Sequence, residues 1–216
     1  MTNKPDKPVQ PLRLAVLASG EGQTLQAILD AIAAGSLAAE VVLVVSNNAD
    51  AGVLRRGRQA GVATLHLSAA THPDAAVLDA ALTQALQDCG AEVVVTAGYM
   101  KKLGPQVMSA FHRRMINIHP SLLPKYGGAG MYDRHVHAAV LAAGEVESGA
   151  SVHFVEGDYD SGPLIAQATV PVLADDTVET LAERVKQRER QLLFDVLCRR
   201  AVEGAFPARI EEEAKA

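Results

Sequence analysis

Short apolar runs alternate along the chain with segments whose apolar residues recur every three or four positions. The runs, rich in Val, Leu and Ala, indicate buried strands, and the recurring pattern indicates amphipathic helices. Strands are expected over 12–18, 41–45, 62–67 and 92–97, and helices over 25–34, 51–60, 73–89 and 105–111. Strands and helices that alternate at this spacing form a parallel sheet covered on both faces. The pattern therefore predicts an α/β fold built on a Rossmann-like, doubly wound, mostly parallel sheet.

The last third of the chain has a different pattern. Two apolar runs, 150–155 and 164–172, are joined by a glycine-rich loop, which favours an antiparallel hairpin. Leu181, Val185, Leu192 and Val196 then recur at helical spacing within 177–201. We therefore expect an antiparallel C-terminal hairpin and a long C-terminal helix. The whole is predicted to be a single domain over 12–205, with tails at 1–11 and 206–216.

Two polar side chains stand at the end of a predicted strand near the middle of the chain. Asn117 and His119 are two residues apart, so an extended segment points both to the same face, while Ile116 and Ile118 point to the other. Pro120 cannot continue a sheet ladder, so the strand ends here. An amide and an imidazole at a strand tip indicate a catalytic site in an α/β fold. The alternative is that both side chains only cap or brace a turn.

A glycine-containing loop follows the first predicted strand and leads into a helix, for which Thr24 is the expected N-cap. The N-terminus of a helix after such a loop binds anions through its backbone N–H groups. A dinucleotide site would need a third glycine where Leu25 stands, and an acid where the second strand ends in Ser46, Asn47 and Asn48. The loop thus favours a single phosphate over NAD. A tight turn without a ligand is the alternative.

Composition and charge exclude several classes of function. The formal net charge is −5 and no basic cluster is present, which argues against nucleic-acid binding. No apolar run approaches the roughly 18 residues of a membrane span. The two cysteines, Cys89 and Cys198, have no evident partners, which favours a reducing cytoplasm. His135 and His137 fall on different faces of a helix expected over 132–143, so no metal site is predicted.

The segment Asn117–Tyr126, followed about forty residues later by Tyr159–Pro163, resembles the folate-dependent formyltransferases. The resemblance extends over residues 14–189. Among these enzymes it is greatest to those that formylate glycinamide ribonucleotide, a small amine of purine synthesis. It implies 10-formyltetrahydrofolate as the formyl donor, no metal, and small-molecule partners for a monomer or homodimer.

The resemblance also implies roles for particular residues. Asn117, His119 and Asp160 would be catalytic, with the charge of Asp160 keeping His119 protonated. Gly22, Gln23 and Thr24 would hold the substrate phosphate, and Lys186 and Glu189 would bind the glycinamide end. The folate would be held by Met100, Lys101, Lys102, Leu103, Asn117, Glu156, Gly157, Asp158, Tyr159 and Asp160. For Glu189, the alternative is a solvent-exposed ion pair with Lys186.

The chain departs from the family pattern at two places that bear on the acceptor. The phosphate loop commonly reads Gly-x-Gly-Ser-Asn, and here the hydroxyl has moved one place along, to Thr24, with Glu21 adding a negative charge. Arg190 stands where relatives usually have histidine. Three other functions stay open: hydrolysis of the formyl donor, formylation of an amino-sugar nucleotide, and nucleotide binding by a regulatory module.

Overall fold

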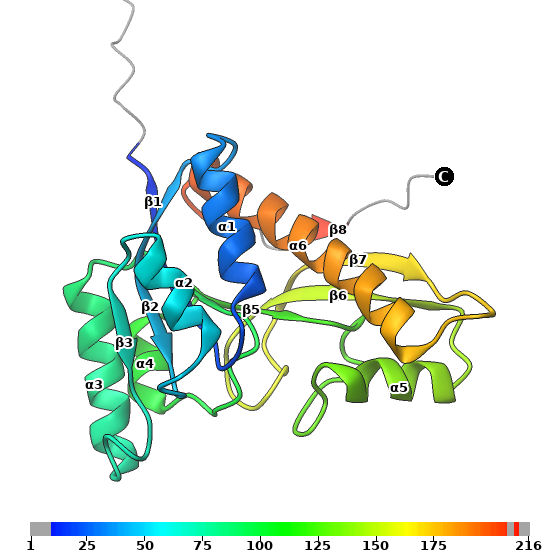
Figure 1. Ribbon diagram of the computed structural model, residues 1–216, viewed down its shortest axis with the longest axis horizontal. Coiled ribbons are helices and arrows are strands. Elements are labelled where there is room, and N and C mark those ends of the chain that lie inside the picture. Colours follow the sequence, from blue (N-terminus) through cyan, green and yellow to red (C-terminus); the bar gives the residue numbers. More distant parts are fainter. Residues whose placement is uncertain (1–9, 207–209, 212–216) are drawn as a thin grey trace, which may run out of the picture.

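The computed structural model describes residues 10–206 and 210–211. In this part of the chain one eight-stranded sheet has the order β3-β2-β1-β4-β5-β6-β7-β8 (Figure 1). The strands are β1 Leu12–Leu17, β2 Ala39–Ser46, β3 Thr64–His66, β4 Val93–Thr96, β5 Met115–His119, β6 Glu147–Phe154, β7 Leu164–Pro171 and β8 Ile210–Glu211. The helices are α1 Gln23–Ala33, α2 Gly52–Gln59, α3 Ala75–Asp88, α4 Pro105–Ala110, α5 Arg134–Ala142 and α6 Val178–Glu203.

The directions of the strands confirm the predicted fold class. Strands β1 to β5 pair in parallel, and β6 pairs antiparallel with both β5 and β7. The chain runs from β1 outward to β3, then returns to place β4 on the other side of β1. Ligands of doubly wound folds bind at such a reversal, outside the carboxyl ends of the strands. The topology therefore directs attention to the loops after β1, β4 and β5.

The sheet has a separate apolar core on each face, because successive strand residues point to opposite sides. In β1, Leu14 and Val16 join the cluster beneath α1, α2 and α6. Ala15 and Leu17 join the cluster beneath α3 and α4. The result is the three-layer arrangement that the alternating pattern predicts.

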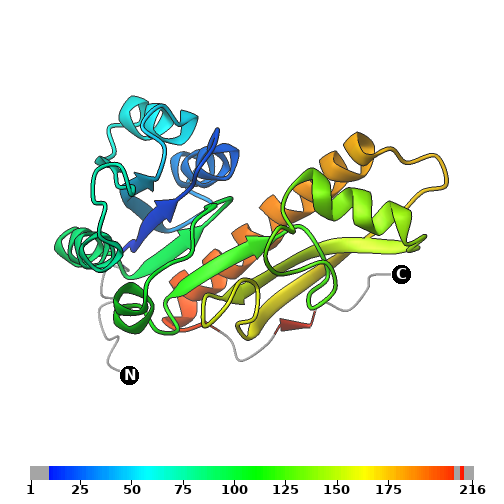
Figure 2. The same ribbon diagram turned by 90° about the horizontal axis from the view of Figure 1, so that it is seen from below.

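Helix α6 is the longest element and crosses much of the molecule. It contacts β5, β6 and β7 along one face of the sheet, as Figure 2 shows, and also contacts α1 and α5. Thr177 and Thr180 form a reciprocal capping box at its start, and Gly204 ends it in the left-handed conformation that glycine adopts at little cost. Among the described residues, no helix is long and apolar enough to cross a membrane.

Two predictions about the ends of elements are wrong. The N-cap of α1 is Gly22, in the left-handed conformation, and Thr24 lies inside the helix. The expected tail from 206 onward begins too early, because Phe206 packs edge-on against Phe154 with ring centres 5.6 Å apart. Ile210–Glu211 then pairs in parallel with β7 as β8. The rest of both expected tails, residues 1–9, 207–209 and 212–216, lies outside the described part.

Candidate active site

A cavity of about 980 Å³ opens at the carboxyl ends of β1, β4 and β5. Its walls are the loops that follow these strands, the loop between β6 and β7, and one face of α6. Every residue predicted for the site lines this cavity except Glu156. The carboxylate of Glu156 instead faces the side chain of Arg113, 3.1 Å away.

Asn117 lies in a row of polar side chains that crosses three strands. The strand register pairs it with Thr96 of β4 on one side and His153 of β6 on the other. The hydroxyl of Thr96 donates to Asn117 Oδ1 at 2.8 Å, and Asn117 Nδ2 lies 3.1 Å from His153 Nε2. His153 Nδ1 donates to the carbonyl of Phe154 at 2.8 Å, and His153 Nε2 also lies 3.4 Å from Asp160 Oδ1. The row therefore holds the Asn117 amide between Thr96 and His153.

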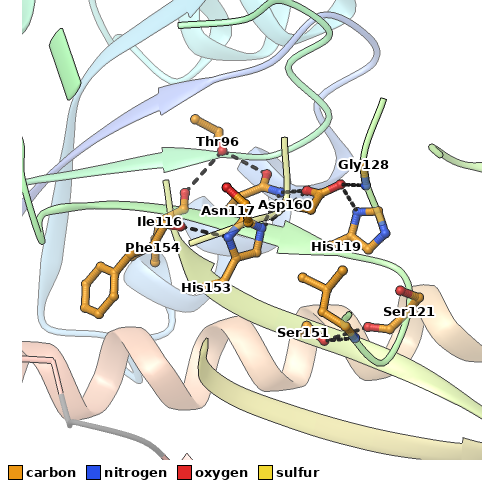
Figure 3. A network of polar contacts seen from close by, with 12 residues as sticks. Thr96, Ile116, Asn117, His119, Ser121, Gly128, Ser151, His153, Phe154 and Asp160 are labelled. Carbon is orange, nitrogen blue, oxygen red and sulfur yellow. Dashed lines mark hydrogen bonds and ion pairs between the residues drawn. The ribbon is translucent and has the colours of Figure 1, made fainter. Parts of the chain in front are cut away.

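Asp160 lies opposite this row and joins it to His119, as Figure 3 shows. Its carboxylate accepts hydrogen bonds from Asn117 Nδ2 at 3.3 Å and from the backbone N–H of Gly128 at 2.9 Å. Burial raises the pKa of this carboxyl group, but His153, His119 and the Gly128 N–H outweigh burial and lower the pKa below its usual range. Asp160 is therefore ionised at neutral pH.

The neighbouring Asp158 has a different environment. Its side chain is 84% exposed and forms a 2.6 Å ion pair with Lys102 across the mouth of the cavity. The structure thus brings Asn117, His119 and Asp160 together and leaves Asp158 at the rim.

His119 is buried, and both of its ring nitrogens have defined neighbours. Nε2 donates to the carbonyl of Tyr126 at 2.8 Å, and Nδ1 faces Asp160 Oδ2 at 3.4 Å. Burial lowers the pKa of His119 below its ordinary value, although Asp160 and the Tyr126 carbonyl act to raise it. Burial therefore opposes the protonated His119 expected from the sequence, while Asp160 and the Tyr126 carbonyl favour it.

The turn after His119 is held by hydrogen bonds from β6. Ser151 Oγ donates to the carbonyl of Ser121 at 2.6 Å and accepts from the N–H of Leu123 at 3.0 Å. Ser121 is itself fully buried and bonds the carbonyl of Lys125. This bracing holds the chain that supplies the Tyr126 carbonyl to His119.

The predicted phosphate loop presents the start of α1 to the cavity. The first backbone N–H groups of a helix have no helical acceptor, and in α1 these are the N–H groups of Gln23, Thr24 and Leu25. No side chain caps this helix either. Glu21 extends away toward α2, where its carboxylate lies 3.4 Å from Arg55 Nη2. Its negative charge is therefore partly balanced outside the anion site.

Helix α6 lines the opposite wall with Lys186, Glu189 and Arg190. Lys186 Nζ lies 3.4 Å from Asp133 Oδ1, so the ion-pair partner of Lys186 is Asp133. Burial raises the pKa of Glu189 to about 7, against the opposing charges of Lys186 and Arg190 and with help from Asp133. These contacts do not support the solvent-exposed Lys186–Glu189 pair considered from the sequence.

Two loops, after β4 and between β6 and β7, line the part of the cavity where the folate was expected. The N–H of Met100 donates to Ser19 Oγ at 2.7 Å, which ties the loop after β4 to the end of β1. Met100 and Tyr159 expose 45% and 43% of their surface. Exposed apolar and aromatic side chains at a cleft favour a flat aromatic ligand.

Sequence reasoning missed His153 and Thr96 as members of the site. The signal was clearest for Thr96, which is the one polar residue of β4, whereas β6 carries Glu147, Ser148 and Ser151 besides His153. The register that aligns them could not be read from the sequence. In the described part of the chain, no three His, Cys, Asp or Glu side chains are placed to hold a metal ion.

Comparison with known proteins agrees with this geometry. The formyl transferase family model matches residues 12–197. The phosphoribosylglycinamide formyltransferase of Escherichia coli is 42% identical over 84% of this chain and 83% of its own length. A chloroplastic protein of that name from Vigna unguiculata is 39% identical over 86% of this chain, which spans only 59% of that relative. The solved phosphoribosylglycinamide formyltransferase of Coxiella burnetii, 43% identical, superposes with a TM-score of 0.83, covering 89% of this chain and 88% of the other. The chain therefore belongs to the formyl transferase family.

Proposed function

We propose that the protein transfers the formyl group of 10-formyltetrahydrofolate to the glycinamide amine of 5'-phosphoribosylglycinamide, in the purine-synthesis pathway. The observation that carries this proposal is one cavity lined by the uncapped N-terminus of α1, by the Asn117–His119–Asp160 group and by the exposed side chains of Met100 and Tyr159. We place the enzyme in the cytoplasm, where its two free cysteines would stay reduced, as a monomer or homodimer.

Asn117 stabilises the charge that develops on the formyl oxygen as the amine attacks the formyl carbon. Of its two N–H groups, one is directed at His153 Nε2 and the other makes the longer, 3.3 Å contact with Asp160. The formyl oxygen can replace this longer contact. A positioned donor of this kind contributes about 3 kcal/mol to the stabilisation of an oxyanion.

His119 and Asp160 together move the proton that must pass from the amine to the departing folate nitrogen. A neutral His119 with its proton on Nε2 has a lone pair on Nδ1, beside Asp160. Nδ1 accepts the proton that the amine loses as the new C–N bond forms, and the charge of Asp160 stabilises the resulting imidazolium. The same proton then passes to the folate nitrogen as the old C–N bond breaks.

The direct test supplies the formyl donor with and without glycinamide ribonucleotide and follows both formylated product and free formate. We expect product only when the acceptor is present. Formate released at the same rate without acceptor would instead identify a hydrolase. Product from an amino-sugar nucleotide but not from glycinamide ribonucleotide would identify the other transferase, and binding without turnover would identify a regulatory module.

We expect Arg190→Met to raise the KM for the phosphorylated acceptor at least about ten-fold, the scale for one hydrogen bond between charged groups. Arg190 lines the cavity together with Thr24 at the start of α1. Its ion pair with Glu183 is 3.6 Å long, beyond hydrogen-bond distance, so the guanidinium can turn to a phosphate. The measurement is steady-state kinetics with each substrate varied.

Arg199→Met is the matched control, since it removes the same charge from an exposed position near the end of α6. Its KM should equal that of the wild type. An increase in the folate KM as large as that for the acceptor would contradict the assignment of Arg190 to the phosphate.

For Glu189→Gln we expect an increase of about ten-fold in acceptor KM with unchanged thermal stability. Because the pKa of Glu189 is about 7, its charge is present above that pH, and wild-type acceptor KM should fall as pH rises through 7. Glutamine abolishes that dependence. Glu203→Gln, at the exposed end of the same helix, is the control. A variant with the pH profile of the wild type would contradict a contact between Glu189 and the amine.

A further inference from the structure

The hydroxyl of Thr96 contacts the Asn117 amide. The proposed reaction gives this hydroxyl no role. Thr96 is the last residue of β4, is 5% exposed and lines the cavity. Its Oγ1 lies 2.8 Å from Asn117 Oδ1 and 3.3 Å from the carbonyl of Ile116 (Figure 3). The shorter distance assigns the hydroxyl proton to the amide oxygen.

The other contacts of the amide require the same orientation. A flipped amide would place Oδ1 where Nδ2 now stands, 3.3 Å from a carboxylate oxygen of Asp160. That contact would be repulsive. Only with Oδ1 toward Thr96 does every polar atom of the amide meet a partner of the opposite kind.

We infer that Thr96 is a positioning residue for formyl transfer, whose hydroxyl anchors Asn117 Oδ1 so that Nδ2 is directed at the reacting formyl oxygen. This inference rests on the proposed function. In the transition state Nδ2–H leaves Asp160 for the formyl oxygen, and the bond from Thr96 then holds the amide on its other side. A hydrogen bond accepted at Oδ1 also polarises the amide and makes its N–H a better donor.

The pair Thr96→Val and Thr96→Ser tests this role. Valine has nearly the same shape without the hydroxyl, and it suits a strand whose other residues are Val93, Val94 and Val95. We expect Thr96→Val to lower kcat about five- to ten-fold, the rate equivalent of one hydrogen bond between uncharged groups, with both KM values unchanged. Serine keeps the hydroxyl, so Thr96→Ser should retain kcat within about two-fold.

A double-mutant cycle and a spectrum separate positioning from a structural role. In an Asn117→Ala background the Thr96→Val change should have no further effect on kcat, since the amide on which it acts is gone. In selectively ¹⁵N-asparagine-labelled protein, Thr96→Val should shift the side-chain amide signal of Asn117, and Thr96→Ser should leave it in place.

Wild-type kcat in Thr96→Val, an equal loss in the Asn117→Ala background, or an unshifted Asn117 amide signal would overturn the inference. So would a lower melting temperature with kcat intact, which is the result of a purely structural hydrogen bond. A wild-type protein that forms no formylated acceptor would refute the proposed function instead. The amide signal is readable in that case too, so the two failures remain distinguishable.

Discussion

Asp160→Asn should lower kcat by at least about 100-fold, the scale for loss of a positioned acid–base group. Asparagine keeps the size of the side chain but removes the charge that stabilises the His119 imidazolium. Because Asp160 raises the pKa of His119, its removal should move the titration of that imidazole to still lower pH. Steady-state kinetics and NMR of the labelled imidazole measure the two effects.

The backbone at Asp160 makes asparagine the appropriate substitute. Asp160 has φ +55°, in the left-handed region that asparagine and aspartate occupy more readily than other residues with a side chain. Thermal stability should therefore change little. Asp158→Asn is the matched control, because its carboxylate is exposed and paired with Lys102. Near-normal turnover in Asp160→Asn, or a greater loss in Asp158→Asn, would overturn the role of Asp160.

Gly162→Ala should destabilise the fold by about 3 kcal/mol or more. The atoms nearest the new methyl group are backbone atoms, so the clash can be relieved only by moving the backbone. A Cβ at Gly162 would lie 1.9 Å from the carbonyl oxygen of Phe154 and 2.8 Å from its carbon. Relief requires β6 and β7 to separate where the loop carrying Asp160 begins. Urea unfolding measures the stability, and turnover should fall together with it.

Gly20→Ala is the control for this substitution. It adds the same methyl group where no atom lies within 4 Å of the new Cβ, so stability should change by less than about 0.5 kcal/mol. Equal stability of the two variants would show that the hairpin can accommodate a side chain at residue 162.

The crowding at Gly22 also bears on how the phosphate loop can be tested. Gly22 has φ +74°, and an added Cβ would lie 2.7 Å from Val53 Cα. A β-branched residue there should disturb the contact of α1 with α2 as well as any ligand. The effect of such a variant on KM would not isolate a phosphate contact, so Arg190 is the sharper probe.

The layers of the fold could be predicted from the sequence because they depend on local periodicity. Short β-branched runs such as Val93–Val95 favour a buried strand, and the long stripe from Leu181 to Val196 favours a helix. The glycine-rich loop at 157–162 likewise indicated the hairpin. Boundaries followed less well, since the sequence favoured a hydroxyl N-cap at Thr24 where the structure uses the left-handed backbone of Gly22.

The candidate site could be predicted only as far as short motifs extend. The spacing of Asn117 and His119 placed them on one face, and the resemblance added Asp160. The protonation state of His119 depends on a balance between burial and two partners, and burial is not visible in a sequence. The direction of the Glu156 side chain was equally inaccessible, because it depends on Arg113 of a separate loop.

The number of residues in α6 between its capping box and the cavity determines which side chains face the acceptor. Lys186, Glu189 and Arg190 face the cavity because the helix starts at Val178, after the N-cap Thr177, and turns about 100° with each residue. One residue inserted between Thr177 and Lys186 would rotate all three relative to the capping box, and would rotate the core residues Leu192 and Val196 of the same helix with them. Among related chains, insertions and deletions should therefore occur in the connection between β7 and Thr177, and not in the first three turns of α6. Anyone who grafts a new acceptor specificity onto this scaffold must change side chains there and leave the residue count alone.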